Sequence, residues 1–187
     1  MTNGLSPVKQ DTSPRFIVLT GGPGGGKTAL IRELAADPDW RGRLLALPEA
    51  ISVAGQTGVS MREPLFQRLM VEVQRGMEDA VARALEPGDG RIILCHRGTL
   101  DPLAYWLDRG WPEEEFFAYT PTTRDEHYRR WPEAHRPEQS DDAIRLDRLL
   151  ERVWSGYPAY HRIDNTGRDW PAKAAAALAI LTAHLPQ

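Results

Sequence analysis

Five glycines fall within residues 21 to 26 of the chain, and a lysine and a threonine follow them directly, in the stretch TGGPGGGKT. Glycine is costly in ordered structure because it loses more conformational entropy on folding than any other residue, so such a cluster needs a chemical reason. The spacing Gly21-x-x-x-x-Gly26-Lys27-Thr28 is typical of a loop whose backbone N–H groups surround a phosphate. Lys27 can reach the terminal phosphates, and the Thr28 hydroxyl is a hard oxygen ligand that suits Mg²⁺. The predicted nucleotide-binding residues are Gly22, Gly24, Gly25, Gly26, Lys27 and Thr28, with Thr28 also the predicted metal ligand.

The elements on either side of this loop are those that phosphate binding requires. RFIVLT (15–20) is a short apolar, β-branched run that predicts a strand, and KTALIRELAAD (27–37) predicts a helix that ends at Pro38. The positive N-terminal end of that helix would face the phosphate. The alternative, a flexible glycine-rich turn with a solvated lysine, does not explain this setting. We therefore predict that the chain binds ATP or GTP.

Strand and helix patterns alternate along the rest of the chain, which predicts a parallel sheet covered by helices. Further strands are expected at RLLALPEA (43–50) and RIILC (91–95), with FFAY (116–119) and YHRIDN (160–165) as candidates for two more. A long helix is expected from Ser60 to the residues before Pro87, because Ser60 and Glu63 have the spacing of a capping box. Its expected core-facing stripe consists of Phe66, Leu69, Val73, Met77, Ala80 and Ala84. Further helices are expected before Gly110, after Ser140 and over 169–185.

Composition limits the partners and the compartment. The length of 187 residues suits one domain over 15–187, preceded by a loose, Pro- and Ser-containing leader at 1–14. A net charge of −3 argues against a broad surface for nucleic acid, and no apolar run is long enough to span a membrane. The one cysteine, Cys95, excludes an internal disulfide and fits a reducing cytoplasm. The sequence leaves the oligomeric state open.

The ordered motifs resemble those of small P-loop kinase-like proteins of the AAA family, related to nucleoside, nucleotide and ribosylnicotinamide kinases. The matching pieces run in the same order over most of residues 15–185: TGGPGGGKT, LPEA, FQ, HRGTLDPLAYW, HRPEQSDDA and IDNTG. The resemblance implies a nucleotide-kinase-like α/β fold, with a parallel sheet of about five strands and an arginine-bearing lid at about 121–139. Because the chain lacks the Asn-Lys-x-Asp motif with which GTPases read guanine, ATP is preferred over GTP.

The resemblance also suggests roles for residues outside the loop. Glu49, at the end of the second strand, would face the acceptor hydroxyl as a base or help to hold the metal; an ordinary solvated carboxylate is the alternative. Relatives more often read Asp-Arg-Gly where this chain has His96-Arg97-Gly98, so His96 stands where a magnesium-side carboxylate is usual. Arg97 would bind an acceptor phosphate or steady the lid. Asp101 would accept a hydrogen bond or act through water, and the alternatives are a surface arginine and a helix-capping aspartate.

Two further sites follow from the resemblance. Arg136, just before the helix that Ser140 caps, matches a lid arginine that clamps the transferring phosphate; a solvated charge is the alternative. IDNTGRDW resembles the loop that holds adenine through the backbone of Asn165 to Gly167, although a turn leading to an Asp169 helix cap explains it equally well. The resemblance lacks one element, because no apolar run lies between Thr122 and Ala143 where relatives have a strand before the lid. Either FFAY fills that place or the strand is missing.

Two functions fit these observations. The first is an ATP- and Mg²⁺-dependent kinase that phosphorylates a small-molecule acceptor such as a nucleoside or nucleotide. That acceptor would bind between Glu49, the 51–62 loop and the helix around Phe66 and Gln67. The second is a nucleotide-binding switch or slow ATPase that acts through a protein partner, an alternative favoured by the histidine at position 96.

Overall fold

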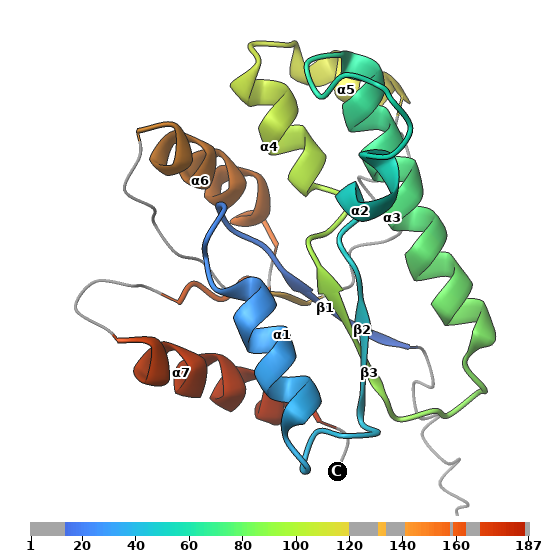
Figure 1. Ribbon diagram of the computed structural model, residues 1–187, viewed down its shortest axis with the longest axis vertical. Helices are drawn as coiled ribbons and strands as arrows, with labels where there is room; N and C mark the ends of the chain where they lie inside the picture. Colours follow the sequence, from blue (N-terminus) through green and yellow to red (C-terminus); the bar gives the residue numbers. More distant parts are fainter. Residues whose placement is uncertain (1–13, 120–130, 134–140, 158, 164–168, 186–187) are drawn as a thin grey trace, which may run out of the picture.

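The chain folds around one parallel sheet that ends beside the glycine-rich loop (Figure 1). The computed structural model describes residues 14–119, 131–133, 141–157, 159–163 and 169–185. Its strands are β1 (Arg15–Leu19), β2 (Leu44–Leu47), β3 (Ile92–His96) and β4 (Trp131–Glu133), arranged in the order β2-β3-β1-β4. All three strand pairs are parallel, and Leu19 lies opposite His96 in the β1–β3 register. The carboxyl ends of the strands therefore meet at one edge of the sheet.

Helices cover both faces of this sheet, as Figure 1 shows. They are α1 (Lys27–Ala36), α2 (Ile51–Ala54), α3 (Pro64–Ala84), α4 (Asp101–Asp108), α5 (Glu113–Tyr119), α6 (Asp141–Trp154) and α7 (Trp170–Ala183). Helices α1 and α7 pack on one face, where Leu34 and Leu181 contact the core around Ile17 and Leu94. On the other face, Trp154 of α6 and the C-terminal half of α3 pack against Val18 and Ile93. Adjacent residues of β1 thus bury side chains on opposite faces, which explains its unbroken apolar sequence.

The strand expected at FFAY was wrong, and so was the expectation that 122–143 holds no strand. FFAY lies in α5, where the ring of Phe116 packs edge-on against Trp106 with a centroid separation of 5.7 Å. The fourth strand is instead β4, within the polar stretch that was expected to lack one, and its backbone pairs with Ile17 to Leu19 of β1. The described residues form four strands rather than about five, and of YHRIDN they show only an isolated bridge at His161. A short apolar run cannot distinguish strand from buried helix, because tertiary packing decides between them.

Helix α3 also differs from its expected form. It begins at Pro64 rather than Ser60, because the Ser60 and Glu63 side chains form a turn just before it: the Ser60 N–H donates to Glu63 Oε1 over 3.3 Å. Its buried residues are Phe66, Gln67, Val71, Gln74 and Glu78. Of the expected apolar stripe only Phe66 is fully buried, and Ala80 and Ala84 are exposed. The buried face of α3 is therefore largely polar, which is unusual for a helix that packs only against core.

Candidate functional site

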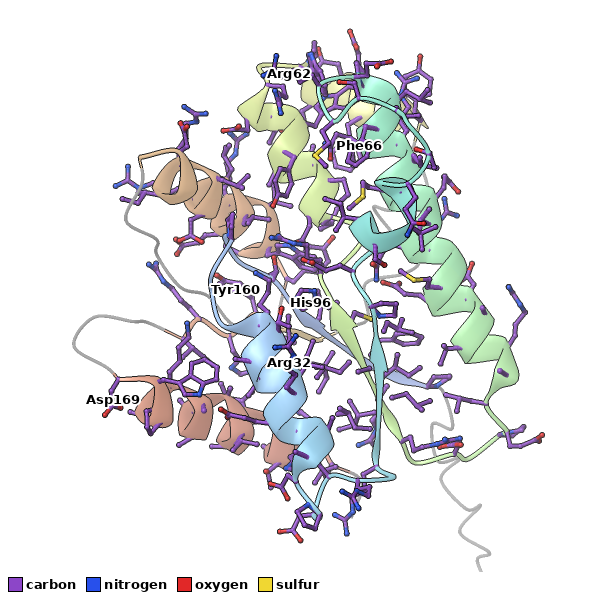
Figure 2. The ribbon with its side chains drawn as sticks, viewed as in Figure 1. Arg32, Arg62, Phe66, His96, Tyr160 and Asp169 are labelled. Carbon is purple, nitrogen blue, oxygen red and sulfur yellow. The ribbon has the colours of Figure 1, made fainter. Side chains whose placement is uncertain are left out.

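The glycine-rich loop, Glu49 and His96 come together because each lies at the carboxyl end of a parallel strand. The loop follows β1, Glu49 lies two residues after β2, and His96 is the last residue of β3. Strands β1 and β3 are neighbours whose chain connections leave toward different sides, and such a point in an open α/β sheet forms a crevice for ligands. Figure 2 shows His96 in this region, between the start of α1 and the end of the sheet. The structure thus places the residues predicted at strand ends in one site.

The loop between β1 and α1 needs glycine at Gly26. Its φ of +80° lies in the left-handed region, and a Cβ there would lie 2.4 Å from a ring carbon of Trp170 on α7. Two side chains from distant elements hold the same loop: Asp147 of α6 accepts a hydrogen bond from the Gly22 N–H (3.0 Å), and Lys173 of α7 donates to the Gly25 carbonyl (3.1 Å). The loop is therefore held in shape by the helices around it.

Lys27 is a buried ammonium group whose contacts are neutral. Its Nζ donates to the Gly21 and Gly22 carbonyl oxygens over 2.9 and 2.8 Å, and the residue is 7% exposed. Burial lowers the pKa of Lys27 to about 8, and the charge of Arg97 acts in the same direction against three nearby carboxylates. An anion placed in the loop would relieve this cost, because opposite charge stabilises a buried cation. The loop is therefore built to receive an anion.

His96 links Thr28 to Glu49. Its Nδ1 lies 3.1 Å from Glu49 Oε1, and its Nε2 lies 3.2 Å from Thr28 Oγ1. Because an ionised carboxylate only accepts hydrogen bonds, Nδ1 carries the donated proton, and Nε2 of a neutral ring accepts from the Thr28 hydroxyl. The hydroxyl oxygen then keeps its lone pairs for another partner.

The oxygen atoms near His96 fit Mg²⁺ as a nucleotide-bound ion. Thr28 Oγ1 and the Glu49 carboxylate, whose side chain is 31% exposed, are hard oxygen ligands. No cluster of three or more His, Cys, Asp or Glu in the described part of the chain could hold a metal by itself. Mg²⁺ does not require such a cluster, since it keeps several waters and usually takes one or two protein oxygens beside the phosphates.

Glu49 is ionised in the folded chain. Burial raises its pKa, but the hydrogen bond from His96 and the charge and hydrogen bond of Arg97 outweigh burial and lower the pKa to about 2. Arg97 Nε donates to the same oxygen as His96, over 3.0 Å. A carboxylate with so low a pKa is a weak proton acceptor, so its chemistry favours orienting a hydroxyl or a metal-bound water. The partners of Glu49 also argue against the ordinary solvated carboxylate that the sequence left open.

Both carboxylate oxygens of Asp101 already accept hydrogen bonds from the protein. The residue is 1% exposed, and Oδ1 accepts from Thr20 Oγ1 (2.9 Å) and Arg97 Nη1 (3.1 Å). Oδ2 accepts from the Gly98 N–H (3.0 Å) and the Trp154 indole N–H (3.2 Å). These four bonds leave little capacity for a metal or a substrate. Of the roles considered from the sequence, the geometry favours a hydrogen-bond acceptor that positions its neighbours.

Arg97 is held in a strained conformation. Its φ of +76° makes it the one non-glycine residue with positive φ among the described residues. Such a conformation persists only where the surroundings enforce it, and here Glu49 and Asp101 both bind the guanidinium group, whose side chain is 12% exposed. Arg97 is therefore not the surface arginine that the sequence left as an alternative.

A cavity of about 460 Å³ joins the loop to helices α2, α3 and α4. Lys27, Thr28, Glu49, His96 and Arg97 lie on its wall together with Gly24 and Gly26. The remaining wall is mostly apolar and aromatic, with two amides, the carboxylate of Asp101 and one further cation: Pro23, Ala50, Ile51, Met61, Phe66, Gln67, Met70, Gln74, Gly98, Asp101, Pro102, Tyr105 and Arg109. Figure 2 shows Phe66 near the start of α3, well away from His96. The space therefore extends from the phosphate loop to a region that suits an organic ring.

Several predicted residues lie outside the described part of the chain. Arg136, Asn165 and Gly167 are among them, as is most of the predicted lid at 121–139, of which 131–133 form β4. Their roles stay predictions. The Asp169 cap is observed directly, since its carboxylate accepts a hydrogen bond from the Ala172 N–H over 3.0 Å at the start of α7.

Sequence reasoning missed four buried polar residues near the site. Asp147 and Lys173 support the loop from α6 and α7, and no local pattern marks them. Gln74 and Glu78 lie on α3, where a signal did exist: with Gln67 they form a polar stripe at i, i+7 and i+11 beside the expected apolar one. No described helix is long and apolar enough to cross a membrane.

Comparisons with known proteins agree with the fold described above. A family model described as an AAA domain matches residues 16–170. No curated protein sequence matches the chain. The crystal structure of a NadR protein in complex with NAD and AMP-PNP superposes with a TM-score of 0.68 at 15% identity, over 91% of this chain and 49% of that one. The chain thus spans about half the length of that protein.

Two smaller kinases match over nearly their whole length. Thymidylate kinase from Ehrlichia chaffeensis gives a TM-score of 0.67 at 15% identity, over 90% of this chain and 99% of that one. Deoxyadenosine kinase from M. mycoides gives 0.61 at 12% identity, over the same two fractions. At identities this low, these superpositions establish a shared fold alone.

Proposed function

We propose that this chain, which belongs to the AAA-domain family and has the fold of P-loop kinases, transfers the γ-phosphate of ATP to a small organic acceptor. The acceptor class is a nucleoside or a nucleotide. The observation that carries the proposal is the cavity of about 460 Å³, which is lined by the phosphate loop and also by Phe66, Met70 and Tyr105. Because adenine is predicted to bind at 165–167, a protein that only hydrolysed ATP would need no ring-sized space among Phe66, Met70 and Tyr105.

The loop and Lys27 bind the triphosphate in this proposal. The N–H groups around Gly24 to Thr28 surround phosphate oxygens, and the start of α1 adds its positive end. Lys27 exchanges its bonds to the Gly21 and Gly22 carbonyls for bonds to phosphate, which gives the buried ammonium group a charged partner. Nucleotide binding therefore relieves the cost of burying this cation.

Thr28 and Glu49 would hold Mg²⁺, directly or through water, with His96 orienting the Thr28 hydroxyl. Bound Mg²⁺ supplies positive charge that neutralises phosphate oxygens during transfer. Glu49 also lies on the cavity wall, where its carboxylate can accept a hydrogen bond from the acceptor hydroxyl and align it for attack. Arg97 holds Glu49 in place, and Asp101 holds Arg97. The acceptor ring packs among Phe66, Met70 and Tyr105, with Gln67 as a hydrogen-bonding partner on the same wall.

One observation favours the second candidate, a nucleotide switch or slow ATPase. His96 contacts Thr28 where related proteins more often carry a carboxylate, and an imidazole is a poor ligand for a cation that prefers oxygen. Weak metal binding would slow phosphoryl transfer and leave a protein that reports its bound nucleotide to a partner.

Measuring ADP release separates the two candidates. The purified chain is incubated with ATP and Mg²⁺, alone and with pools of nucleosides or nucleoside monophosphates, beside the variants Lys27→Met and Arg32→Ala. Arg32 is an exposed residue of α1 and serves as the control (Figure 2). Release that needs an acceptor, persists in Arg32→Ala and disappears in Lys27→Met supports the kinase. Release that no acceptor changes, but that a protein partner raises, supports the switch.

A further inference from the structure

One cation on the cavity wall has no part in the proposed reaction. Arg109 follows the last residue of α4 and lines the cavity. It is exposed, and its guanidinium group makes no hydrogen bond or ion pair in the part of the chain that the structure describes. The neighbouring carboxylate in the sequence, Asp108, pairs with Arg145 of α6 instead. Because a guanidinium group does not lose its proton in proteins, Arg109 is a permanent cation at the cavity.

The other charged side chains of the wall have partners, either in the chain or in ATP. Arg97 pairs with both carboxylates of the wall, Glu49 over 3.0 Å and Asp101 over 3.1 Å. Lys27 would face the triphosphate of ATP. Arg109 is therefore the one charge on the described wall to which neither the chain nor ATP supplies an opposite charge.

The position of Arg109 along α4 indicates which end of an acceptor it would meet. Asp101, Tyr105 and Arg109 are four residues apart, so they share one face of the helix, and all three line the cavity. At about 1.5 Å per residue, Arg109 lies about 12 Å further along α4 than Asp101, which holds Arg97 at the reacting end. Helical side chains lean toward the N-terminus of their helix, so Arg109 extends back over the turn that carries Tyr105. An acceptor whose hydroxyl lies at Glu49 would therefore present its ring to Arg109.

The hydroxyl of Tyr105 adds a second donor on the same face of α4. It makes no hydrogen bond within the described residues, and it is not among their inaccessible atoms that lack a partner, so a ligand can reach it. Burial raises the pKa of Tyr105, which keeps the hydroxyl protonated. The guanidinium group of Arg97 lies 5.5 Å from the centre of the Tyr105 ring and helps to fix the ring. A neutral donor beside an unpaired cation favours an oxyanion as the ligand.

We propose that Arg109 is a specificity residue that binds a negatively charged group on the ring of the phosphoryl acceptor, with the Tyr105 hydroxyl as a second donor. The inference rests on the proposed function and narrows its substrate class to acceptors whose ring carries an anion. A carboxylate on the ring, or an ionised ring nitrogen with its neighbouring carbonyl, supplies that charge. The planar guanidinium group suits a carboxylate best, because it can donate two parallel hydrogen bonds.

Pairs of acceptors that differ mainly in this charge test the proposal. Nicotinic acid riboside is compared with nicotinamide riboside, and 5-carboxyuridine with 5-carbamoyluridine; both pairs exchange a carboxylate for an amide. Xanthosine, at a pH where its ring is ionised, is compared with inosine, which separates the ring-nitrogen source from the carboxylate source. Dissociation constants are measured by calorimetry on the whole chain with a non-hydrolysable ATP analogue, and kcat/KM is measured for every compound that is phosphorylated.

The charged member of at least one pair should bind roughly tenfold more tightly, because only that member forms a charge-assisted hydrogen bond with Arg109. The preference should shrink as salt is raised, since the charges lie near solvent. Arg109→Met removes the charge but keeps an unbranched side chain, and should reduce the preference to about twofold or less by weakening the binding of the charged member. Arg109→Lys keeps the charge and should retain most of the preference, whereas Tyr105→Phe should lose part of it.

Arg83→Met is the matched control. Arg83 is an exposed residue in the last turn of α3 and does not line the cavity, so the same substitution removes a cation from a helix C-terminus elsewhere. It should keep the preference and its salt dependence. Arg109→Met and Arg83→Met should both melt near the wild type, because neither side chain is buried.

The outcomes separate this inference from the kinase proposal. If acceptors are phosphorylated but no charged member is preferred, or the preference survives Arg109→Met or falls equally in Arg83→Met, the role of Arg109 is wrong and the kinase stands. If charged acceptors bind with a preference that requires Arg109 but none is phosphorylated, the role of Arg109 is supported and the kinase is wrong. If no charged compound binds, the inference is overturned.

Discussion

Replacing Asp101 with asparagine tests whether the site depends on one fully bonded carboxylate. The substitution removes a charge and one acceptor position but keeps the size of the side chain. Asparagine must direct its NH₂ group at one of two donor pairs: Thr20 and Arg97, or Gly98 and Trp154. The second pair offers only N–H groups and cannot accept, so the NH₂ group faces Thr20 and Arg97. The Thr20 hydroxyl can rotate to accept, but the guanidinium group of Arg97 cannot.

The expected cost follows from that geometry. Asp101 is 1% exposed and the Arg97 side chain is 12% exposed, so the variant leaves a buried cation with Glu49 as its one remaining ion-pair partner in the described chain. Breaking a buried ion pair by removing one partner costs about 3–5 kcal/mol. We expect the free energy of unfolding to fall by about 3 kcal/mol in Asp101→Asn. This is the low end of that range, because Arg97 keeps its ion pair with Glu49.

Urea denaturation measures this loss, with Asp108→Asn as the matched control. Asp108 pairs with Arg145, whose side chain is 59% exposed, so the same substitution should cost no more than about 1 kcal/mol there. The m-values of both variants should equal that of the wild type, which would show that the change lies in stability. If Asp101→Asn loses no more stability than Asp108→Asn, the network drawn around Asp101 is wrong.

Three further predictions concern charges around the loop. Lys27→Ala should abolish nucleotide binding or turnover while leaving the thermal melt near that of the wild type, because the ammonium group of Lys27 hydrogen-bonds to loop carbonyls. Unchanged affinity and turnover would contradict the phosphate role. His96→Asp should lower the Mg²⁺ concentration needed for ATP binding, because it places an anionic oxygen beside Thr28. His96→Asn, which adds no charge, should not lower it. Identical Mg²⁺ titrations for the two variants would refute the placement of His96 beside the metal site. For Asp147, burial raises the pKa to about 6 from an ordinary 3.8, so its contribution to stability is complete below about pH 4 and is lost as the pH rises through 6. The free energy of unfolding of Asp147→Asn should therefore exceed that of the wild type by about 1–3 kcal/mol at pH 7 and by little at pH 4. Urea denaturation at both pH values measures the difference. Equal differences at the two pH values would show that Asp147 does not titrate as described.

The phosphate loop could be predicted from sequence because its signal is local. Gly26 needs a positive φ and no Cβ, and that requirement is visible as a glycine at one position of a fixed pattern. The placement of Glu49, His96 and Arg97 followed from parallel strands that share one edge. The local patterns at residues 15–19, 44–47 and 92–96 were strong enough to give those strands.

The wrong predictions concern segments whose structure is determined by contacts with residues distant in the sequence. Phe116 and Phe117 are apolar enough for a strand, but the packing of Phe116 against Trp106 belongs to a helix. β4 exists because the edge of β1 is available, and its own three residues carry no strand pattern. The stripe chosen for α3 assumed that its buried face meets a core, whereas Gln67 and Gln74 lie on a cavity wall. A polar residue buried beside a ligand site resembles an exposed one until the fold is known.

The fate of the γ-phosphate tests the central claim most directly. The chain is incubated with Mg²⁺ and ATP labelled on that phosphate, in the presence of a pool of nucleosides and nucleoside monophosphates, and the label is traced to the acceptor, to inorganic phosphate or to the protein. The cavity that joins Lys27 and Thr28 to Phe66 and Met70 predicts that the label appears on one organic acceptor, faster than it appears as inorganic phosphate. Label that appears only as inorganic phosphate, at a rate no acceptor changes, would contradict a kinase.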